Sequence, residues 1–164
     1  MGFASAGSRV GLLARSKTEL DLARLEIEHA GGSAIHLAAD VRDLDQMREA
    51  VVRMERELGP PGVLVCAAGI QGPVGPFVET APDAWVETIE VNLIGVANAC
   101  RAVLPSMIER RRGKIIVLSG GGGAYARPNF TAYACSKTAV IRLVESLAEE
   151  VRDHNVQVNA MAPG

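Results

Sequence analysis

The stretch that decides both fold and chemistry is residues 133–144, Tyr-Ala-Cys-Ser-Lys-Thr-Ala-Val-Ile-Arg-Leu-Val. Its apolar residues recur at helical spacing, which predicts a helix with one buried face. Residues four apart lie on the same face of a helix, so the Tyr133 phenol and the Lys137 ammonium are expected to be neighbours. A fixed cation stabilises the ionised form of a nearby phenol and suits it to proton transfer. Tyrosine and lysine at this spacing are also common on exposed helices. The pair alone therefore leaves two interpretations open, a proton-transfer pair or an exposed pair on an amphipathic helix.

Outside this stretch, short apolar runs alternate with helical periods along the chain. These runs are apolar along their whole length rather than at every second residue, which is typical of parallel strands with helices on both faces. The sequence therefore predicts an α/β fold, a doubly wound parallel sheet of the Rossmann-like kind, in one partial domain over residues 1–164. Strands are predicted at residues 9–14, 33–39, 63–66, 114–118 and 156–160, and helices at 16–30, 43–58, 80–112 and 133–153.

Residues at the ends of these segments support the assignment. Ser16 followed by Glu19 forms a capping box, and Asp43 is a favourable N-terminal cap. Pro82 suits the first turn of the third predicted helix, and Pro105 predicts a kink inside it.

The composition excludes several classes of function. The chain has 164 residues, 48% of them hydrophobic and 22% charged, with a formal net charge of -2. This balance gives no reason to expect nucleic acid or an anionic membrane as a partner. No apolar run is identified that reaches the roughly 18 residues of a membrane span. Cys66, Cys100 and Cys135 stand at spacings unlike any metal pattern, and we expect reduced core cysteines in a cytoplasmic protein without a metal site.

Several short motifs, taken in order, resemble those of the short-chain dehydrogenase/reductase family. Each is weak evidence alone, but together they follow the family's order and spacing. The resemblance implies an oxidoreductase that transfers hydride between a nicotinamide cofactor and a carbonyl or alcohol. The matching segments are Leu13-Ala14-Arg15, Ala39-Asp40-Val41, Ala67-Ala68-Gly69, Val91-Asn92-Leu93-Ile94-Gly95, Tyr133 to Lys137, and Val158-Asn159-Ala160 leading to Pro163 and Gly164.

The resemblance implies a catalytic role for three of these residues. Tyr133 would donate a proton to the carbonyl oxygen of a small-molecule substrate, with the reverse in oxidation. Lys137 would make the tyrosine more acidic and hold the ribose hydroxyls of the nicotinamide. Asn92 would anchor a water that resupplies protons. The alternative for Asn92 is a residue at a helix bend whose side chain is satisfied by backbone groups.

The implied cofactor contacts follow the ends of the predicted strands, where ligands bind in doubly wound sheets. Asp40 and Val41 would contact the adenine, and Ala68 and Gly69 would form a turn that lets the backbone approach the ribose. The remaining implied cofactor contacts are Tyr133, Lys137, Pro163 and Gly164.

Arg15 and Ser16 bear on the choice between the two nicotinamide cofactors. They stand where an NAD-preferring relative usually has an acidic residue for the adenosine ribose. A carboxylate would repel a 2'-phosphate, whereas a guanidinium with a hydroxyl beside it can clamp one. NADP(H) is therefore predicted over NAD(H). The alternative is that Arg15 is merely a solvated residue at the end of a strand.

The sequence departs from the family at the catalytic serine, where it has Gly120, with Ser119 one residue earlier. Ser119 would substitute for that serine if the glycines that follow let the loop turn its hydroxyl inward. Two alternatives remain open: Ser119 is a structural hydroxyl at the end of the strand, or backbone N–H groups of the glycines hold the substrate oxygen.

The sequence also departs from the family at both ends. It holds no glycine-rich phosphate loop and no strand before that loop. In the family that strand is central, between those at Val10 and Val63, so two inner edges are expected to expose unpaired backbone groups. The segment that would shape the substrate site after Gly164 is missing as well, so the sequence does not predict the substrate.

Two hypotheses about function follow. The first is an NADP-dependent carbonyl reductase or alcohol dehydrogenase, favoured by Asn92, Tyr133 and Lys137. The second is a non-catalytic or cofactor-deficient fragment that acts only as an oligomerisation module. In the family the helices that match residues 80–112 and 133–153 pair between subunits, which predicts a homodimer or homotetramer.

Overall fold

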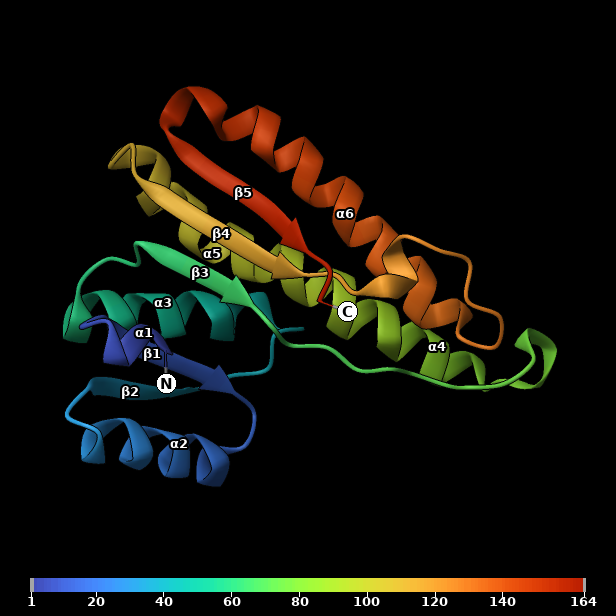
Figure 1. Ribbon diagram of the computed structural model, residues 1–164, viewed down its shortest axis with the longest axis horizontal. Coiled ribbons are helices and arrows are strands. Elements are labelled where there is room, and N and C mark those ends of the chain that lie inside the picture. The colour runs from blue at the N-terminus through green and yellow to red at the C-terminus, as the bar shows by residue number, and fades with distance from the viewer. Residues whose placement is uncertain (1, 164) are drawn as a thin grey trace.

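The computed structural model describes residues 2–163, and strands alternate with helices in the predicted order (Figure 1). Apart from the long helix predicted at residues 80–112, the predicted positions are confirmed to within two residues. The elements are α1 (Gly2–Ser5), β1 (Arg9–Ala14), α2 (Lys17–His29), β2 (Ser33–Ala38), α3 (Leu44–Leu58), β3 (Val63–Cys66), η1 (Phe77–Glu79), α4 (Pro82–Ile89), η2 (Glu90–Ile94), α5 (Gly95–Glu109), β4 (Gly113–Leu118), η3 (Gly121–Gly123), α6 (Thr131–Val151), η4 (Arg152–His154) and β5 (Val156–Met161).

The strands form two separate parallel sheets. The amino-terminal sheet contains β1 and β2, with Arg9 opposite Ser33. The carboxyl-terminal sheet has the order β3-β4-β5. Figure 1 shows β1 and β3 on the facing sides of the two sheets, and within residues 2–163 no strand pairs with both. The expectation of two unpaired inner edges is therefore confirmed.

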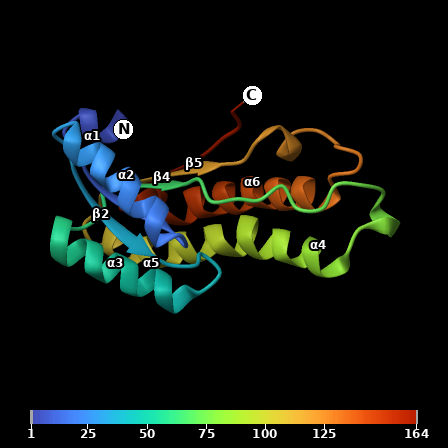
Figure 2. The same cartoon turned by 90° about the horizontal axis from the view of Figure 1, so that it is seen from below.

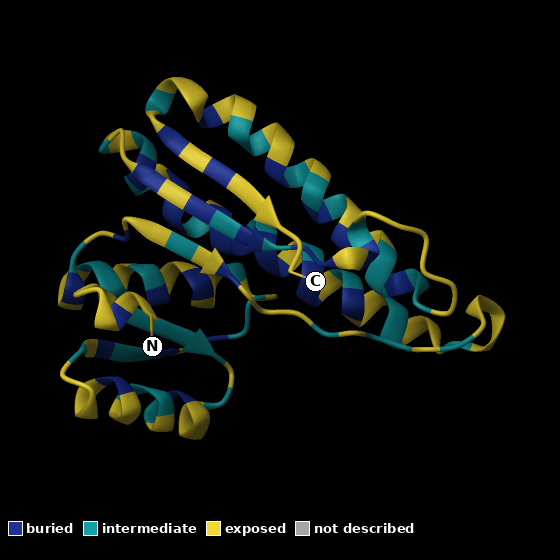
Figure 3. Ribbon diagram, in the orientation of Figure 1, coloured by how far each residue is buried: buried dark blue, intermediate teal, exposed yellow. Residues whose placement is uncertain are grey.

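Helices cover the two sheets unequally. Figure 2 shows α3, α4, α5 and α6 in one layer, and α1 and α2 on the other side, over the amino-terminal sheet. Within the described part of the chain no helix covers the second face of β3, β4 and β5. In β4, buried residues accordingly alternate with exposed or half-buried ones, and β5 alternates over residues 156–159 before it ends in exposed residues (Figure 3). Val63 and Val65 of β3 are 42% and 41% exposed. The doubly wound arrangement is thus present around the amino-terminal sheet and one-sided around the other.

The main hydrophobic core lies between the carboxyl-terminal sheet and the α5–α6 layer and extends through α3 to Leu37 of β2. Met107, Ile115, Val117 and Val140 have no exposed surface there. Cys66 and Cys100 belong to this core as predicted, and both are free thiols. The prediction for Cys135 is wrong, because this residue is exposed on α6. A second, smaller core joins Ala4, Ile27 and Ala34 beside the amino-terminal sheet.

The long helix is interrupted where a continuous helix was predicted. Between α4 and α5 the backbone takes a π turn over Glu90–Ile94, and Pro105 lies inside α5. A π turn inserts one residue into the helical period and is frequently found at functional sites. By length and composition Pro82–Glu109 could cross a membrane, a run the sequence analysis did not identify. Over half of its apolar window, 56%, is buried in the protein, as in a core helix.

Candidate active site

Tyr133 lies in the first turn of α6, and its ring packs directly against the glycine loop after β4. A Cβ added to Gly120 would stand 2.7 Å from the Tyr133 hydroxyl oxygen, and one added to Gly122 would stand 2.8 Å from the ring carbon Cδ1. The backbone of Gly120 has φ +111°, which other residues rarely adopt. The absence of side chains at these two positions therefore makes room for the ring.

Tyr133 is half-buried, and the protein leaves its hydroxyl free. Among residues 2–163, no hydrogen bond involves this hydroxyl, and the side chain reaches solvent. A phenolic O–H can both donate and accept a hydrogen bond, so its full capacity is open to a ligand.

Lys137 stands one helical turn further along α6, on the same face as Tyr133. Its Nζ is 5.7 Å from the centroid of the Tyr133 ring and donates a hydrogen bond of 2.8 Å to the Leu118 carbonyl. The residue is only 6% exposed, and desolvation lowers the pKa of its ammonium. The predicted proximity of phenol and ammonium is thus present in the fold.

Ser119 is buried, and within residues 2–163 no hydrogen bond joins its hydroxyl to that of Tyr133. Its Oγ donates to the Lys137 carbonyl at 3.3 Å, and the residue is 3% exposed. A Cβ on Gly123 would stand 2.6 Å from the same Oγ. This geometry corresponds to the alternative of a structural hydroxyl that joins the end of β4 to α6. The catalytic role predicted for Ser119 has no geometric support.

Asn92 is completely buried in the π turn, and its side chain makes three hydrogen bonds. Its Oδ1 accepts from the Ile70 N–H at 2.8 Å, while Nδ2 donates to the Ile70 carbonyl at 2.8 Å and to the Ser136 Oγ at 3.0 Å. The side chain is therefore held by backbone and hydroxyl groups, as the second interpretation expected. Both amide protons of Asn92 are used in these bonds. A water bound to Asn92 would therefore donate to one of its oxygen atoms, and this water-anchoring role stays a prediction.

Ser136 is a residue of the site that the sequence analysis did not identify. Its hydroxyl accepts from Asn92 and donates to the Tyr133 carbonyl at 2.8 Å, and it has no exposed surface. A continuous chain of hydrogen bonds therefore runs from Ile70, after β3, through Asn92 and Ser136 to the main chain of Tyr133. The only sequence signal was the place of Ser136 inside the Tyr133 to Lys137 motif.

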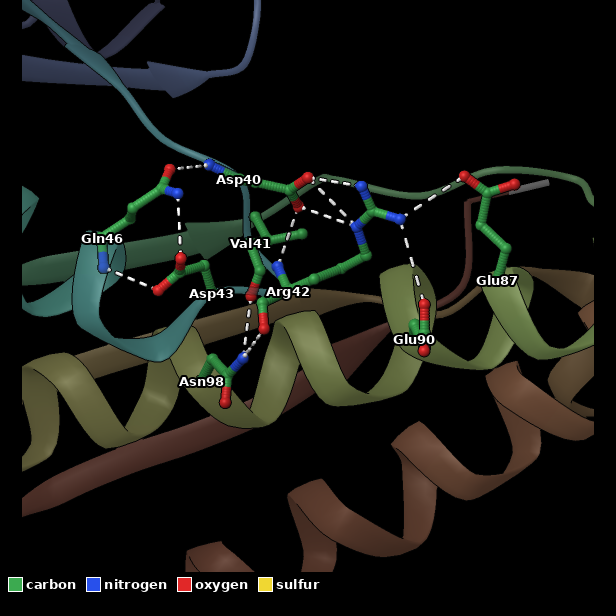
Figure 4. A network of polar contacts seen from close by, with 8 residues as sticks. All are labelled: Asp40, Val41, Arg42, Asp43, Gln46, Glu87, Glu90 and Asn98. Carbon is green, nitrogen blue, oxygen red and sulfur yellow. Dashed lines mark hydrogen bonds and ion pairs between the residues drawn. The ribbon is translucent and has the colours of Figure 1, made fainter.

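The predicted adenine contacts lie in a polar network after β2 (Figure 4). The Asp40 carboxylate accepts three hydrogen bonds from the Arg42 guanidinium, the shortest at 2.7 Å. These bonds hold the pKa of the Asp40 carboxyl below its usual value. Arg42 also forms ion pairs with Glu87 at 3.6 Å and Glu90 at 3.9 Å, so it connects this loop to α4 and η2.

Asn98 and Gly95 of α5 contact the loop that contains Val41 and Arg42. Asn98, 7% exposed, donates from Nδ2 to the Val41 carbonyl at 2.9 Å and to the Arg42 carbonyl at 3.0 Å. A Cβ on Gly95 would stand 2.6 Å from the Val41 side chain, so the loop lies directly on the helix. Sequence reasoning placed Gly95 in a motif and missed Asn98.

The other predicted cofactor residues are spread along the carboxyl ends of the strands. Arg15 is exposed, and its charge helps to lower the pKa of the Asp40 carboxyl. The Ser16 hydroxyl caps α2 by accepting the Glu19 N–H at 3.3 Å, which confirms the predicted cap. Ala68, Gly69 and Pro163 are exposed, and Gly164 lies outside the described residues. The fold thus gathers Tyr133, Lys137, Asn92 and Gly69 at one place and Arg15, Ser16, Asp40 and Val41 at another.

Comparison with known proteins gives consistent results. The sequence pattern of the family described as short chain dehydrogenase matches residues 1–164. A short chain dehydrogenase of Pseudocercospora fijiensis is 42% identical over 164 residues, which cover 99% of this chain and 53% of that protein. The gluconate 5-dehydrogenase of Burkholderia cenocepacia, solved with NADP and tartrate, superposes with a TM-score of 0.93 at 32% identity, over 99% of this chain and 64% of that one.

A third similar structure holds the other nicotinamide cofactor. The 3-oxoacyl-[acyl-carrier protein] reductase of Brucella melitensis, solved with bound NAD, superposes with a TM-score of 0.91 at 33% identity, over 99% of this chain and 63% of that one. In each case the chain spans less than two thirds of its relative.

Proposed function

We propose that this chain, which belongs to the short-chain dehydrogenase family, carries the proton-transfer site of an NADP(H)-dependent oxidoreductase that acts on a small carbonyl or alcohol. The observation that carries the proposal is the hydroxyl of the half-buried Tyr133, which has no hydrogen-bond partner among residues 2–163 and lies beside the desolvated ammonium of Lys137. The O–H group of a phenol held in this way can donate to a ligand, because it makes no hydrogen bond to the described part of the protein.

The residues beside Tyr133 suit the nicotinamide end of a dinucleotide. An ammonium has three N–H donors, and within the described chain Lys137 uses one of them, on Leu118. A Cβ on Gly69 would stand 3.4 Å from the Lys137 Nζ, so the missing side chain leaves room there for a ribose. When bound, the cofactor supplies or accepts the hydride at the substrate carbon.

Proton transfer is the task of the protein. In reduction, Tyr133 passes its proton to the substrate oxygen as negative charge develops on that oxygen. The Lys137 ammonium, fixed by the Leu118 carbonyl, stabilises the phenolate that remains and needs no reorganisation to do so. Ser136 and Asn92 are positioning residues, because they hold the main chain of Tyr133 against the end of β3.

The substrate oxygen needs a second hydrogen-bond donor, and we assign this role to backbone N–H groups of the glycine loop. The Ser119 hydroxyl is engaged with the Lys137 carbonyl, and Gly120 stands where the family's serine is expected. Backbone N–H groups aimed at a developing oxyanion can stabilise it without any side chain. Substitution of Ser119 by alanine is therefore expected to change stability more than it changes catalysis.

The preference for NADP(H) rests on Arg15. Its guanidinium is exposed at the end of β1, while the neighbouring Asp40 carboxylate is occupied by Arg42. The similar structures include one solved with NADP and one solved with NAD. The preference is therefore tested by comparing how this chain binds the two cofactors. Arg15→Ala should weaken NADPH binding by roughly tenfold, a loss of about 1.4 kcal/mol, and leave NADH binding nearly unchanged.

The decisive experiment is a titration of the purified chain with NADPH, followed by nicotinamide fluorescence and then by reduction of small carbonyl compounds. Saturable binding together with loss of reduction in Tyr133→Phe, at unchanged NADPH affinity, is the expected result. Activity that survives Tyr133→Phe would refute the proton-donor role. Failure of the chain to bind NADPH would refute the oxidoreductase assignment for these residues.

One observation favours the second candidate, a non-catalytic oligomerisation module in a cytoplasmic homodimer or homotetramer. In the part of the chain that the structure describes, the edges of β1 and β3 are unpaired, and one face of the carboxyl-terminal sheet is uncovered. The side of the fold that would bind the cofactor is therefore less completely packed than the layer of α4, α5 and α6. A stable dimer by analytical ultracentrifugation, lost when exposed residues of α5 and α6 are charged, together with no NADPH binding, would favour this function.

A further inference from the structure

The loop that joins β4 to α6 ends in a tight turn with the sequence Arg127-Pro128-Asn129-Phe130. The Phe130 N–H donates to the Arg127 carbonyl at 3.1 Å, and Asn129 has φ 66°. Proline at the second position and a left-handed asparagine at the third are typical of a type II turn. The Asn129 carbonyl also accepts the Gly75 N–H at 3.0 Å, which fixes the turn to the loop before η1.

This turn places a guanidinium over the ring of Tyr133, the proposed proton donor. The Arg127 Cζ lies 3.9 Å from the centroid of the Phe130 ring and 5.8 Å from the centroid of the Tyr133 ring. Stacking on aromatic faces holds an arginine in place and leaves the N–H groups at its edge unused.

Arg127 lacks the carboxylate that such a charge normally attracts. None of the ion pairs within residues 2–163 includes it, whereas Arg24, Arg42, Arg53 and Arg142 all have acidic partners. The side chain is exposed and yet oriented by two rings. A positioned guanidinium with free donors is suited to bind two oxygens of an anion at once.

We propose that Arg127 is a specificity-determining residue that selects carbonyl substrates carrying an anionic group, a carboxylate or a phosphate. The proposal rests on the assignment of Tyr133 as proton donor, because the substrate must reach both residues together. The anionic group binds the Arg127 guanidinium while the carbonyl oxygen binds the Tyr133 hydroxyl, which fixes the direction in which a small molecule enters.

Arg127 is well separated from the predicted site of the cofactor's 2'-phosphate. Arg15 follows β1 on the left of Figure 1, whereas the loop of Arg127 joins β4 to α6 on the right, and Figure 2 gives the same separation. The two cations therefore serve different anions: Arg15 that of the cofactor and Arg127 that of the substrate.

The test is direct binding, read from the single tryptophan. Trp85 donates from Nε1 to the Thr131 hydroxyl at 3.2 Å, two residues before Tyr133, so its fluorescence reports on this site. The chain is titrated with acetoacetate, with dihydroxyacetone phosphate and with the uncharged methyl acetoacetate. We expect one or both anions to bind roughly tenfold or more tightly than the ester, and the tighter of the two identifies the anionic group.

Variants assign the effect to Arg127. Arg127→Gln should remove the preference for the anions, and Arg127→Lys should retain part of it. Arg142→Gln removes the same charge from an exposed site on α6 and should leave the preference intact. Equal binding of anion and ester, no measurable anion binding, or an unchanged preference in Arg127→Gln would each overturn the proposal. The reductase assignment fails separately, through the NADPH titration and Tyr133→Phe.

Discussion

The amino-terminal and carboxyl-terminal sheets differ in how firmly they are built. The carboxyl-terminal sheet rests on side chains with no exposed surface, such as Met107 and Ile115, and carries Lys137 and Tyr133 on the helix beside it. The amino-terminal sheet has two strands: Leu37 of β2 reaches the main core, while a small core of Ala4, Ile27 and Ala34 lies on the other side of the sheet. The difference indicates that the residues proposed for proton transfer stand beside the more deeply buried sheet.

The residues proposed to bind the adenosine end of the cofactor lie beside the less completely packed sheet. Arg15 and Ser16 follow β1, whose free edge pairs with no other strand of the described chain. Backbone groups at an unpaired edge remain open to solvent, and regions with few buried apolar contacts open first. We therefore expect a gradient of local stability between the two sheets. Four pairs of substitutions probe the two sheets and the elements packed on them, from the largest effect to the smallest.

The strongest test truncates one apolar side chain in each sheet. Ile115→Ala removes a side chain with no exposed surface from the central strand β4 and should lower the free energy of unfolding by about 2–5 kcal/mol. Leu12→Ala removes a half-buried side chain from β1 and should cost about 1–2 kcal/mol. Urea unfolding measures both. Equal losses would mean that the two sheets are equally well packed.

The second test concerns the glycine loop that seats Tyr133. Gly122→Ala places a Cβ against the ring and should cost about 1–3 kcal/mol. Gly121→Ala is a matched control, because a Cβ there meets nothing within 4 Å. The near-ultraviolet circular dichroism of tyrosine should change in the first variant alone. Similar behaviour of both variants would show that the ring does not depend on this contact.

Local signals explain why most of the secondary structure could be predicted. Ser16 and Asp43 cap helices through side-chain bonds to amides two or three residues away, so the evidence lies inside a short window. The split between the sheets was also predictable, because the strand that would join β1 to β3 has no counterpart in the sequence. The one-sided helix cover of the second sheet was not, since strands with long apolar runs indicated cover on both faces.

The candidate site was predictable in its residues and less so in its contacts. Asn92 was identified from its motif, but its partners Ile70 and Ser136 are 22 and 44 residues away. The direction of the Ser119 hydroxyl depends on the torsions of one loop, including φ +111° at Gly120, and no period in the sequence encodes them. The π turn depends on how Asn92 is held in the folded protein rather than on helix propensity.

The third test loosens the connection between the two sheets. Asn98→Leu leaves the Val41 and Arg42 carbonyls without their donor and should cost about 1–2 kcal/mol. Hydrogen exchange should accelerate in β1 and β2 more than in β4. Arg42→Gln, which breaks ion pairs with exposed Glu87 and Glu90, should cost less, about 0–1 kcal/mol. Uniform acceleration across both sheets would contradict a separate response of the amino-terminal sheet.

The smallest effect is expected from the charge of Lys137, and it appears only as a dependence on pH. Desolvation lowers the pKa of this ammonium in the folded protein, whereas in the unfolded chain it returns to its usual value of ~10.4. Between these two values the unfolded chain binds more protons, so the free energy of unfolding must rise with pH across this window and level off above it. Lys137→Met should abolish that rise, while Lys114→Met, at an exposed position of β4, should preserve it. Urea unfolding from neutral pH to about pH 10 measures the slope, and an unchanged slope in Lys137→Met would mean that the buried ammonium is not the group that titrates.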